Sequence, residues 1–195
     1  MRHLILIDYN HLDNGAFLKG LAKIVAQKNL PPCLFLHGGS EYTERIMQLG
    51  VMREDAEIRA IKELNHRLAA LFGDEGIPII ALNGYQRNLI QITDENEIKI
   101  DSEYLKKISG KTHMLLSCLG MDAQKKIIPV NIQELLDVLV KELNISNIYV
   151  FSETVQNPVL IQNEETKIGL PKEIGSFKGE IKLLGSDFLI SGKLW

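Results

Sequence analysis

Two adjacent glycines, Gly38 and Gly39, separate a short apolar run from a predicted helix, and this pattern suits the binding of an anion. The run from Cys33 to Leu36 has the length of a buried strand, and Ser40 is a good N-cap for the helix that follows. The first turn of a helix carries free N–H groups and a partial positive charge, which favour a phosphate or a carboxylate. We expect the two glycines to adopt dihedral angles that other residues avoid. A turn that uses glycine only for tight packing is an equally good interpretation.

The composition argues against several classes of partner and site. The 195 residues carry a formal net charge of −3 and no run of lysine or arginine, which disfavours nucleic acid or an anionic membrane as the main partner. No apolar stretch reaches transmembrane length, and residues 1–7 are too short for a signal peptide. The five histidines lack paired ligand spacing, so we expect no metal site. Cys33 and Cys118 lie far apart in apolar runs, as is typical of buried, reduced thiols in a cytoplasmic protein.

Strand-like and helix-like segments alternate along the chain, which predicts a single α/β domain over residues 1–195. This alternation indicates a three-layer α/β/α sandwich with a mainly parallel sheet. The strongest helical pattern runs from Glu54 to Phe72, and its apolar stripe is either core or a dimer seam. Residues 120–126 are expected to form a loop. The predicted strands are 3–7, 33–36, 77–82, 88–92, 113–119, 127–128, 147–151, 159–162 and 181–184, and the other helices begin near residues 14, 40, 102 and 131.

Four motifs occur in a fixed order: H-G-G at 37–39, L-N-G-Y-Q-R-N-L-I at 82–90, L-L-S-C-L-G-M-D at 115–122 followed by P-V-N-I-Q at 129–133, and I-Y-V-F-S-E-T-V-Q-N-P-V-L at 148–160. Together they resemble the amino acid kinase family, and within it the N-acetylglutamate kinases. The resemblance implies the fold of that family, with residues 1–150 similar to its substrate-binding part. Residues 151–195 would be a remnant of its nucleotide-binding part. Because I-S-G-K-L-W at 190–195 is similar to the start of a late family motif, we expect the C-terminal nucleotide-binding elements to be missing.

The sequence departs from the family where the chemistry is expected. That family transfers a phosphoryl group from ATP to the side-chain carboxylate of an N-acylated amino acid, and cations stabilise the phosphates. Here the family's first-strand lysine falls on Asp8 and its orienting aspartate falls on Gln133. A carboxylate instead of a lysine about 5 Å from a phosphate changes the interaction energy by about 6 kcal/mol at an effective dielectric constant near 20. We therefore expect kinase turnover to be lost or severely reduced, with ATP and Mg²⁺ as cofactors only if activity survives.

Asp8 has two other interpretations. From the residues alone, it is more simply a turn or cap carboxylate at the end of a strand than a catalytic base. A metal ion that bridges Asp8 to the phosphates is the alternative that would restore nucleotide binding.

The substrate-binding half of the family pattern is better preserved. By resemblance, Gly38 and Gly39 would meet the side-chain carboxylate of the substrate or its phosphate. Asn131 matches a family asparagine, and Arg53 corresponds to the arginine that binds the substrate carboxylate. Arg53 has a second interpretation as a solvated residue near the start of the long helix.

Three functions are consistent with these residues. The first is an acetylglutamate kinase-like protein that binds an N-acylated amino acid or a similar carboxylate with weak or no phosphotransfer. The second is an active acetylglutamate kinase of arginine biosynthesis, and the third is a non-catalytic regulatory or structural subunit.

We expect a homodimer formed through helix 54–72, because the run from Asn65 to Leu68 resembles an interface motif of the family. On its own, that run is the polar face of an amphipathic helix.

Overall fold

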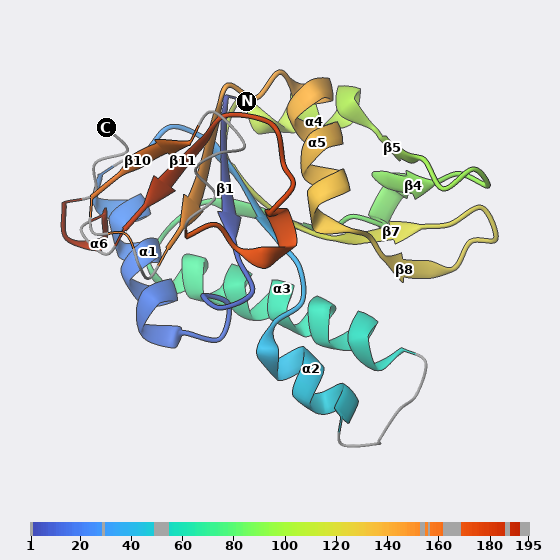
Figure 1. Ribbon diagram of the computed structural model, residues 1–195, viewed down its shortest axis with the longest axis horizontal. Helices are drawn as coiled ribbons and strands as arrows, with labels where there is room; N and C mark the ends of the chain where they lie inside the picture. The colour runs from blue at the N-terminus through green and yellow to red at the C-terminus, as the bar shows by residue number, and fades with distance from the viewer. Residues whose placement is uncertain are drawn as a thin grey trace.

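A seven-stranded sheet forms the centre of the computed structural model, which describes residues 2–28, 30–48, 55–152, 155, 157–161, 169–185 and 188–191 (Figure 1). The strand order is β10-β11-β9-β1-β2-β6-β3. Each neighbouring pair is parallel except β10 and β11, which run antiparallel. The mainly parallel sheet predicted from the sequence is therefore confirmed. The strands are β1 (His3–Ile7), β2 (Cys33–His37), β3 (Ile79–Asn83), β6 (His113–Ser117), β9 (Asn147–Phe151), β10 (Val159–Ile161) and β11 (Ile181–Leu184).

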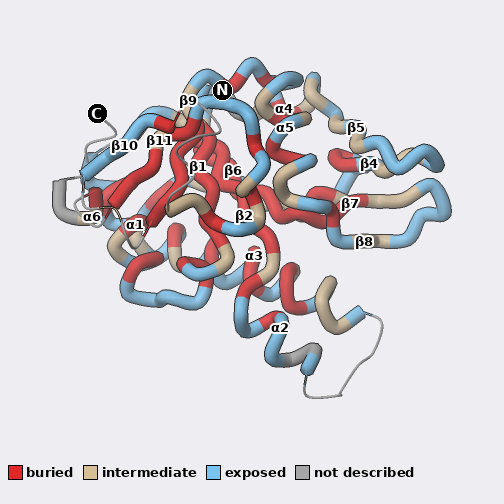
Figure 2. The backbone as a smooth tube through the Cα atoms, in the orientation of Figure 1, coloured by how far each residue is buried: buried red, intermediate tan, exposed pale blue. Residues whose placement is uncertain are grey.

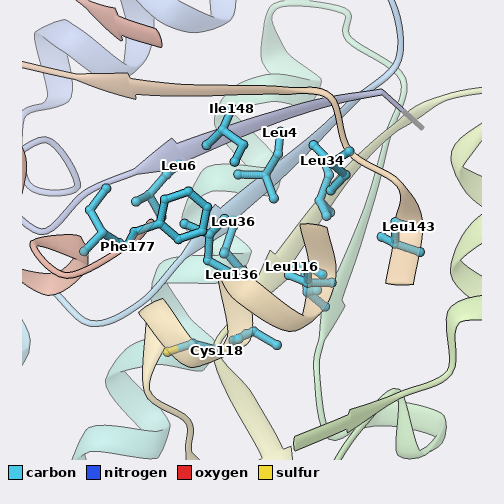
Figure 3. Packing of buried hydrophobic residues seen from close by; sticks show 14 of the residues in the cluster. Leu4, Leu6, Leu34, Leu36, Leu116, Cys118, Leu136, Leu143, Ile148 and Phe177 are labelled. Atoms are coloured by element: carbon cyan, nitrogen blue, oxygen red, sulfur yellow. The ribbon is translucent and has the colours of Figure 1, made fainter. Parts of the chain in front are cut away.

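Helices cover both faces of this sheet, as the three-layer prediction requires. Side chains alternate along β1, so Leu4 and Leu6 pack on the face covered by α5, whereas Ile5 and Ile7 pack on the opposite face. Figure 3 shows the first of these clusters, in which leucines of β1, β2 and α5 meet. The burial-coloured tube in Figure 2 shows the central strands as the most buried part of the chain. The helices on the α5 face are α4 (Ser102–Ser109) and α5 (Ile132–Leu143), and those on the other face are α1 (Gly15–Gln27), α3 (Ala56–Asp74) and α6 (Phe188–Ser191).

A second sheet was not predicted from the sequence. It has the strand order β5-β4-β7-β8 and projects to one side of the molecule (Figure 1). The predicted strand 113–119 is divided, because β6 ends at Ser117 and the chain enters the second sheet at Leu119. The loop expected at 120–126 is therefore wrong for its first two residues, which continue β7. The strands of this sheet are β4 (Ile90–Ile92), β5 (Ile98–Ile100), β7 (Leu119–Met121) and β8 (Ile127–Pro129).

Helix α3 packs its apolar stripe on the main sheet. Ile61, Leu64 and Leu68 are all buried within the chain, which favours the core interpretation of this stripe. Asn65, expected on the polar face, is instead 1% exposed, and its Nδ2 donates to the Leu82 carbonyl at 3.0 Å. A buried amide is stable there because this hydrogen bond replaces its contact with water. Among the described helices, none combines the length and apolarity needed to cross a bilayer.

Candidate functional site

The carboxyl ends of β1, β2 and β9 meet at one edge of the main sheet. The chain leaves β1 toward β2 and leaves β9 toward β11, in opposite directions along the sheet. Such a reversal opens a crevice in which α/β proteins commonly bind ligands. A cavity of about 750 Å³ lies there, with walls formed by residues 8–11 after β1, by Phe151 and Ser152 at the end of β9, and by residues 169–173.

Asp8 is buried at this edge and is bonded within its own turn. Its side chain accepts the Asn10 N–H at 3.0 Å through Oδ1, and its Oδ2 lies 2.5 Å from Nδ1 of His11. The backbone carbonyl of Asp8 accepts the N–H groups of His11 and Leu12. Asp8 is only 1% exposed. By resemblance, the family has a phosphate-binding lysine at this position. Here Asp8 holds the turn between β1 and α1 together through its hydrogen bonds.

His11 completes this buried pair, and the sequence alone gave it no role. Its ring packs against Phe17, with centroids 4.3 Å apart, and against Phe151, with centroids 5.8 Å apart. His11 is 6% exposed and forms part of the wall of the larger cavity. The signal that could have identified it is its spacing of three residues from Asp8 directly after a strand, which lets the two side chains meet across a turn.

The glycine turn lines a second, smaller cavity of about 240 Å³. Neither Gly38 nor Gly39 has a positive φ, so the expectation of special dihedral angles is wrong. A Cβ at Gly38 would lie 3.3 Å from Ile132 Cδ1 and 3.5 Å from Cys118 Sγ. Close approach to α5 therefore explains Gly38, in agreement with the tight-packing interpretation of the turn.

A carboxylate from another segment already binds the N-terminal end of α2 (Glu41–Gln48). Oδ2 of Asp13, which lies in the β1–α1 turn, accepts the Tyr42 N–H at 2.8 Å. The expected N-cap bond from Ser40 is absent, because its hydroxyl is buried and has no partner among the described residues. Instead, the Ser40 N–H donates to Thr43 Oγ1 at 3.2 Å. An anion bound at this helix start would therefore have to compete with Asp13 for the same positive end.

The walls of both cavities are acidic. The described lining of the glycine-turn cavity includes Glu44, Glu57 and Glu173 and contains no lysine or arginine. Lys172 is the one lysine that lines the described walls of the larger cavity, together with Asp8, Glu44 and Glu173. Carboxylates repel an incoming phosphate. Among the described residues, the walls of these two cavities thus carry more acidic than basic side chains.

Tyr9 lies between the two cavities and is held by these acids. Its N–H donates to Glu173 Oε1 at 2.6 Å. Desolvation, together with a hydrogen bond to the Glu44 side chain, raises the pKa of Tyr9 to about 12. The Tyr9 hydroxyl is protonated at neutral pH, and its hydrogen bond is made to Glu44.

The remaining residues singled out by the resemblance have structural contacts of their own. Gln133 Oε1 accepts from the N–H of Ser176 at 3.1 Å and from its hydroxyl at 2.7 Å, so it ties α5 to the segment before β11. Asn131 Oδ1 accepts the N–H groups of Gln133 and Glu134 at 3.0 and 3.1 Å, as an N-cap of α5. Arg53 lies outside the described residues.

The described metal-ligating and thiol side chains are dispersed or buried. Among the residues that the structure describes, no three His, Cys, Asp or Glu side chains are grouped so that they could hold a metal ion. Cys33 and Cys118 are free and buried, and burial raises the pKa of each thiol to about 12. Both thiols are therefore protonated at neutral pH and are poor nucleophiles.

His37 ends β2 directly before the glycine turn and is fully buried. Its Nδ1 donates to the Gly38 carbonyl at 3.0 Å, which leaves Nε2 as an acceptor with no partner in the described part of the chain. Burial lowers the pKa of His37 to about 4. His37 is thus neutral in the folded protein at neutral pH and is poorly suited to act as a cation for a phosphate.

This burial predicts an acid-dependent loss of stability. Between pH 6.5 and 4 the unfolded chain binds a proton at residue 37 whereas the folded chain does not, so the free energy of unfolding falls as the pH falls. Between pH 7.5 and pH 5, His37 should lower the free energy of unfolding by about 2 kcal/mol. Urea unfolding of the wild type and of His37→Gln at both pH values measures it. The exposed His66→Gln is the control, and equal pH dependence in all three proteins would contradict the prediction.

Comparison with known proteins identifies the fold. The sequence matches no protein-family model and no curated protein. Isopentenyl phosphate kinase of T. acidophilum, solved as a product complex, superimposes with a TM-score of 0.58 at 9% identity, over 97% of this chain and 93% of that one. N-acetylglutamate synthase from Neisseria gonorrhoeae, complexed with coenzyme A and N-acetyl-glutamate, gives a TM-score of 0.59 at 14% identity, over 78% of this chain. Aspartate kinase from Synechocystis gives 0.60 at 9% identity, over 79%.

These similar structures share the amino acid kinase fold, and the present chain has that fold. The chain spans 42% of the length of the synthase and 29% of that of the aspartate kinase. At identities this low, the likeness establishes the fold, whereas the activity has to be argued from the residues of the site.

Proposed function

We propose that this chain, with its amino acid kinase fold, is an acetylglutamate kinase-like protein that binds an N-acylated amino acid or a similar small carboxylate and has weak or no phosphotransfer activity. The observation that carries this proposal is the buried Asp8 at the carboxyl end of β1, bonded to His11 and Asn10. A phosphate beside Asp8 would meet a carboxyl group in place of a cation, and negative groups repel one another. The acidic residues around the glycine turn strengthen this effect.

The ligand class follows from what the two cavities allow. A neutral acyl amide is compatible with the glycine turn, where the Tyr9 hydroxyl and the buried Ser40 hydroxyl are polar neighbours. A synthase that shares this fold was solved with N-acetyl-glutamate, which supports a ligand of this kind. The negative end of such a ligand needs cations that the described walls of the glycine-turn cavity do not supply.

The homodimer expected through helix 54–72 remains part of the proposal. Because Ile61, Leu64 and Leu68 are used by the chain's own core, a dimer through α3 would have to form on its exposed polar face. Sedimentation of the purified chain over a range of concentrations tests this. A strict monomer would remove the dimer from the proposal without affecting ligand binding.

Two measurements test the proposed function. Calorimetric titration with N-acetylglutamate and N-succinylglutamate should show binding at millimolar concentration or better. A coupled ADP-release assay with Mg²⁺ or Mn²⁺ should show turnover reduced by about four orders of magnitude from that of an active kinase, the factor equivalent to about 6 kcal/mol. Absence of heat with both ligands would overturn the binding proposal. Robust ADP release that survives Asp8→Ala but is lost in Gly39→Val would instead establish an active kinase.

A further inference from the structure

A basic cleft of about 470 Å³ lies between the first turns of α3 and the β7–β8 hairpin. In Figure 1 this hairpin lies beside the N-terminal half of α3, and the two are in contact through β8. The basic residues of the cleft are Arg59, Lys62, Lys125 and Lys126, and its acidic residues are Asp55 and Glu57. The cleft is therefore positively charged overall, in contrast to both cavities at the edge of the main sheet.

The backbone that presents these cations is well fixed. Lys125 occupies the tight turn of the hairpin with a φ of 62°, and its N–H donates to the Asp122 carbonyl at 3.1 Å. The N–H of Lys126 donates to Asp122 Oδ1 at 2.7 Å. On the opposite wall, the Lys62 Nζ lies 4.6 Å from the centroid of the Tyr85 ring. The backbone of Lys125 and Lys126 is thus fixed on one wall, and Lys62 lines the other wall with its ammonium near the Tyr85 ring.

Few of these positive charges have an ion-pair partner in the described part of the chain. Among the described residues, the one ion pair of the cleft joins Arg59 to Asp55 at 3.7 Å, and both side chains are more than half exposed. An exposed pair of this kind is weak and leaves Arg59 able to rearrange toward a ligand. An excess of basic over acidic residues in the described lining favours an anionic occupant.

The cleft adjoins the glycine-turn cavity, because Glu57 and Pro129 form part of both. A small molecule that lies across this boundary would place a negative group among the lysines and a neutral group beside Gly38 and Gly39. In an N-acylated glutamate the side-chain carboxylate is separated by two methylene groups from the carbon that bears the neutral amide, so these two groups fit the two sides of the boundary. Glu57, at the boundary, would repel the negative group and weaken its binding.

We propose that the carboxylate of the ligand is bound in the cleft between α3 and the β7–β8 hairpin, by Lys125 and Lys126 together with Lys62 and Arg59. This inference rests on the proposed function for the identity of the ligand. It assigns the recognition of negative charge to residues outside the glycine turn. The same chemistry would accept inorganic phosphate, which is therefore a separate probe of the cleft.

Charge variants of the full chain test this assignment by calorimetric titration with N-acetylglutamate at low salt. The double variant Lys125→Gln with Lys126→Gln should bind about 10-fold more weakly. The matched control, Lys107→Gln with Lys141→Gln, removes two exposed lysines from α4 and α5 and should bind like the wild type. Glu57→Gln should bind about 3-fold more tightly. Because a damaged fold does not increase affinity, a gain in this third variant cannot result from unfolding.

The results separate this inference from the proposed function. Binding of N-acetylglutamate that is unchanged in the Lys125 and Lys126 variant would overturn the cleft assignment and leave the proposed function intact. Binding of phosphate, but not N-acetylglutamate, in a manner that depends on these lysines would support the cleft and overturn the ligand proposal. If the wild type binds neither probe and also gives no heat with N-succinylglutamate, both are overturned.

Discussion

Replacement of Gly84 by alanine is expected to lower the free energy of unfolding by about 3 kcal/mol or more. Gly84 lies where the end of β3 meets the second sheet. A Cβ at this position would overlap the Leu119 carbonyl oxygen and lie 2.9 Å from Ile90 Cγ1. The Leu119 oxygen belongs to the backbone, so the clash cannot be relieved by a change of rotamer. Urea unfolding followed by circular dichroism measures the loss.

Two further variants make this prediction specific. Gly110→Ala is the control, because a Cβ at Gly110 meets nothing within 4 Å, and its stability should change by no more than about 0.5 kcal/mol. Adding Ile90→Val to Gly84→Ala removes the Ile90 Cδ1 atom, which the new Cβ would also overlap, and leaves the clash with the backbone oxygen. The double variant should therefore recover only part of the loss. A Gly84→Ala protein as stable as the wild type would show that the two sheets do not approach as closely as described.

Replacement of Asp8 by alanine is expected to lower the free energy of unfolding by about 3 kcal/mol. The change leaves the Asn10 N–H and the buried His11 Nδ1 without their acceptor. Asp8→Asn keeps an acceptor oxygen and should lose about 1 kcal/mol. Neither variant should gain ADP-releasing activity, because the acidic walls formed by Glu44 and Glu173 remain.

A double-mutant cycle measures the interaction energy between the Asp8 and His11 side chains. His11→Phe keeps an aromatic ring beside Phe17 and removes the partner of the carboxyl group. The losses from Asp8→Ala and His11→Phe should then be non-additive by about 1 to 2 kcal/mol. Additive losses would show that Asp8 and His11 act independently and that the short contact between them contributes little to stability.

The main sheet was predictable because its signals are local. The apolar runs of β1, β2 and β9 are bounded by glycines, prolines or polar residues, and the helices between them show a clear 3.6-residue period. The second sheet was not predictable in this way. The apolar pattern continues through Cys118, and nothing local indicates that the chain passes there from one sheet to the other.

The sequence shows some residues of the candidate site but not the charged residues that distant segments bring to it. The glycine turn after β2 and the substitution of Asp8 at the end of β1 are both visible in the sequence. The carboxylate of Asp13 at the start of α2 and the facing lysines of the basic cleft depend on contacts between distant segments. Such contacts follow from the tertiary structure, so no local pattern of residues reports them.

The position of β1 at the centre of the main sheet has a consequence for how the chain reaches this structure. Residues 3–6 of β1 pair with residues 147–150 of β9, on the side away from β2. During synthesis, one edge of β1 therefore stays unpaired until most of the polypeptide has left the ribosome. Folding rates decrease when contacts link residues distant in sequence, and unpaired strand edges favour aggregation. Nascent fragments that end before residue 147 should accordingly depend on chaperones to remain dispersed.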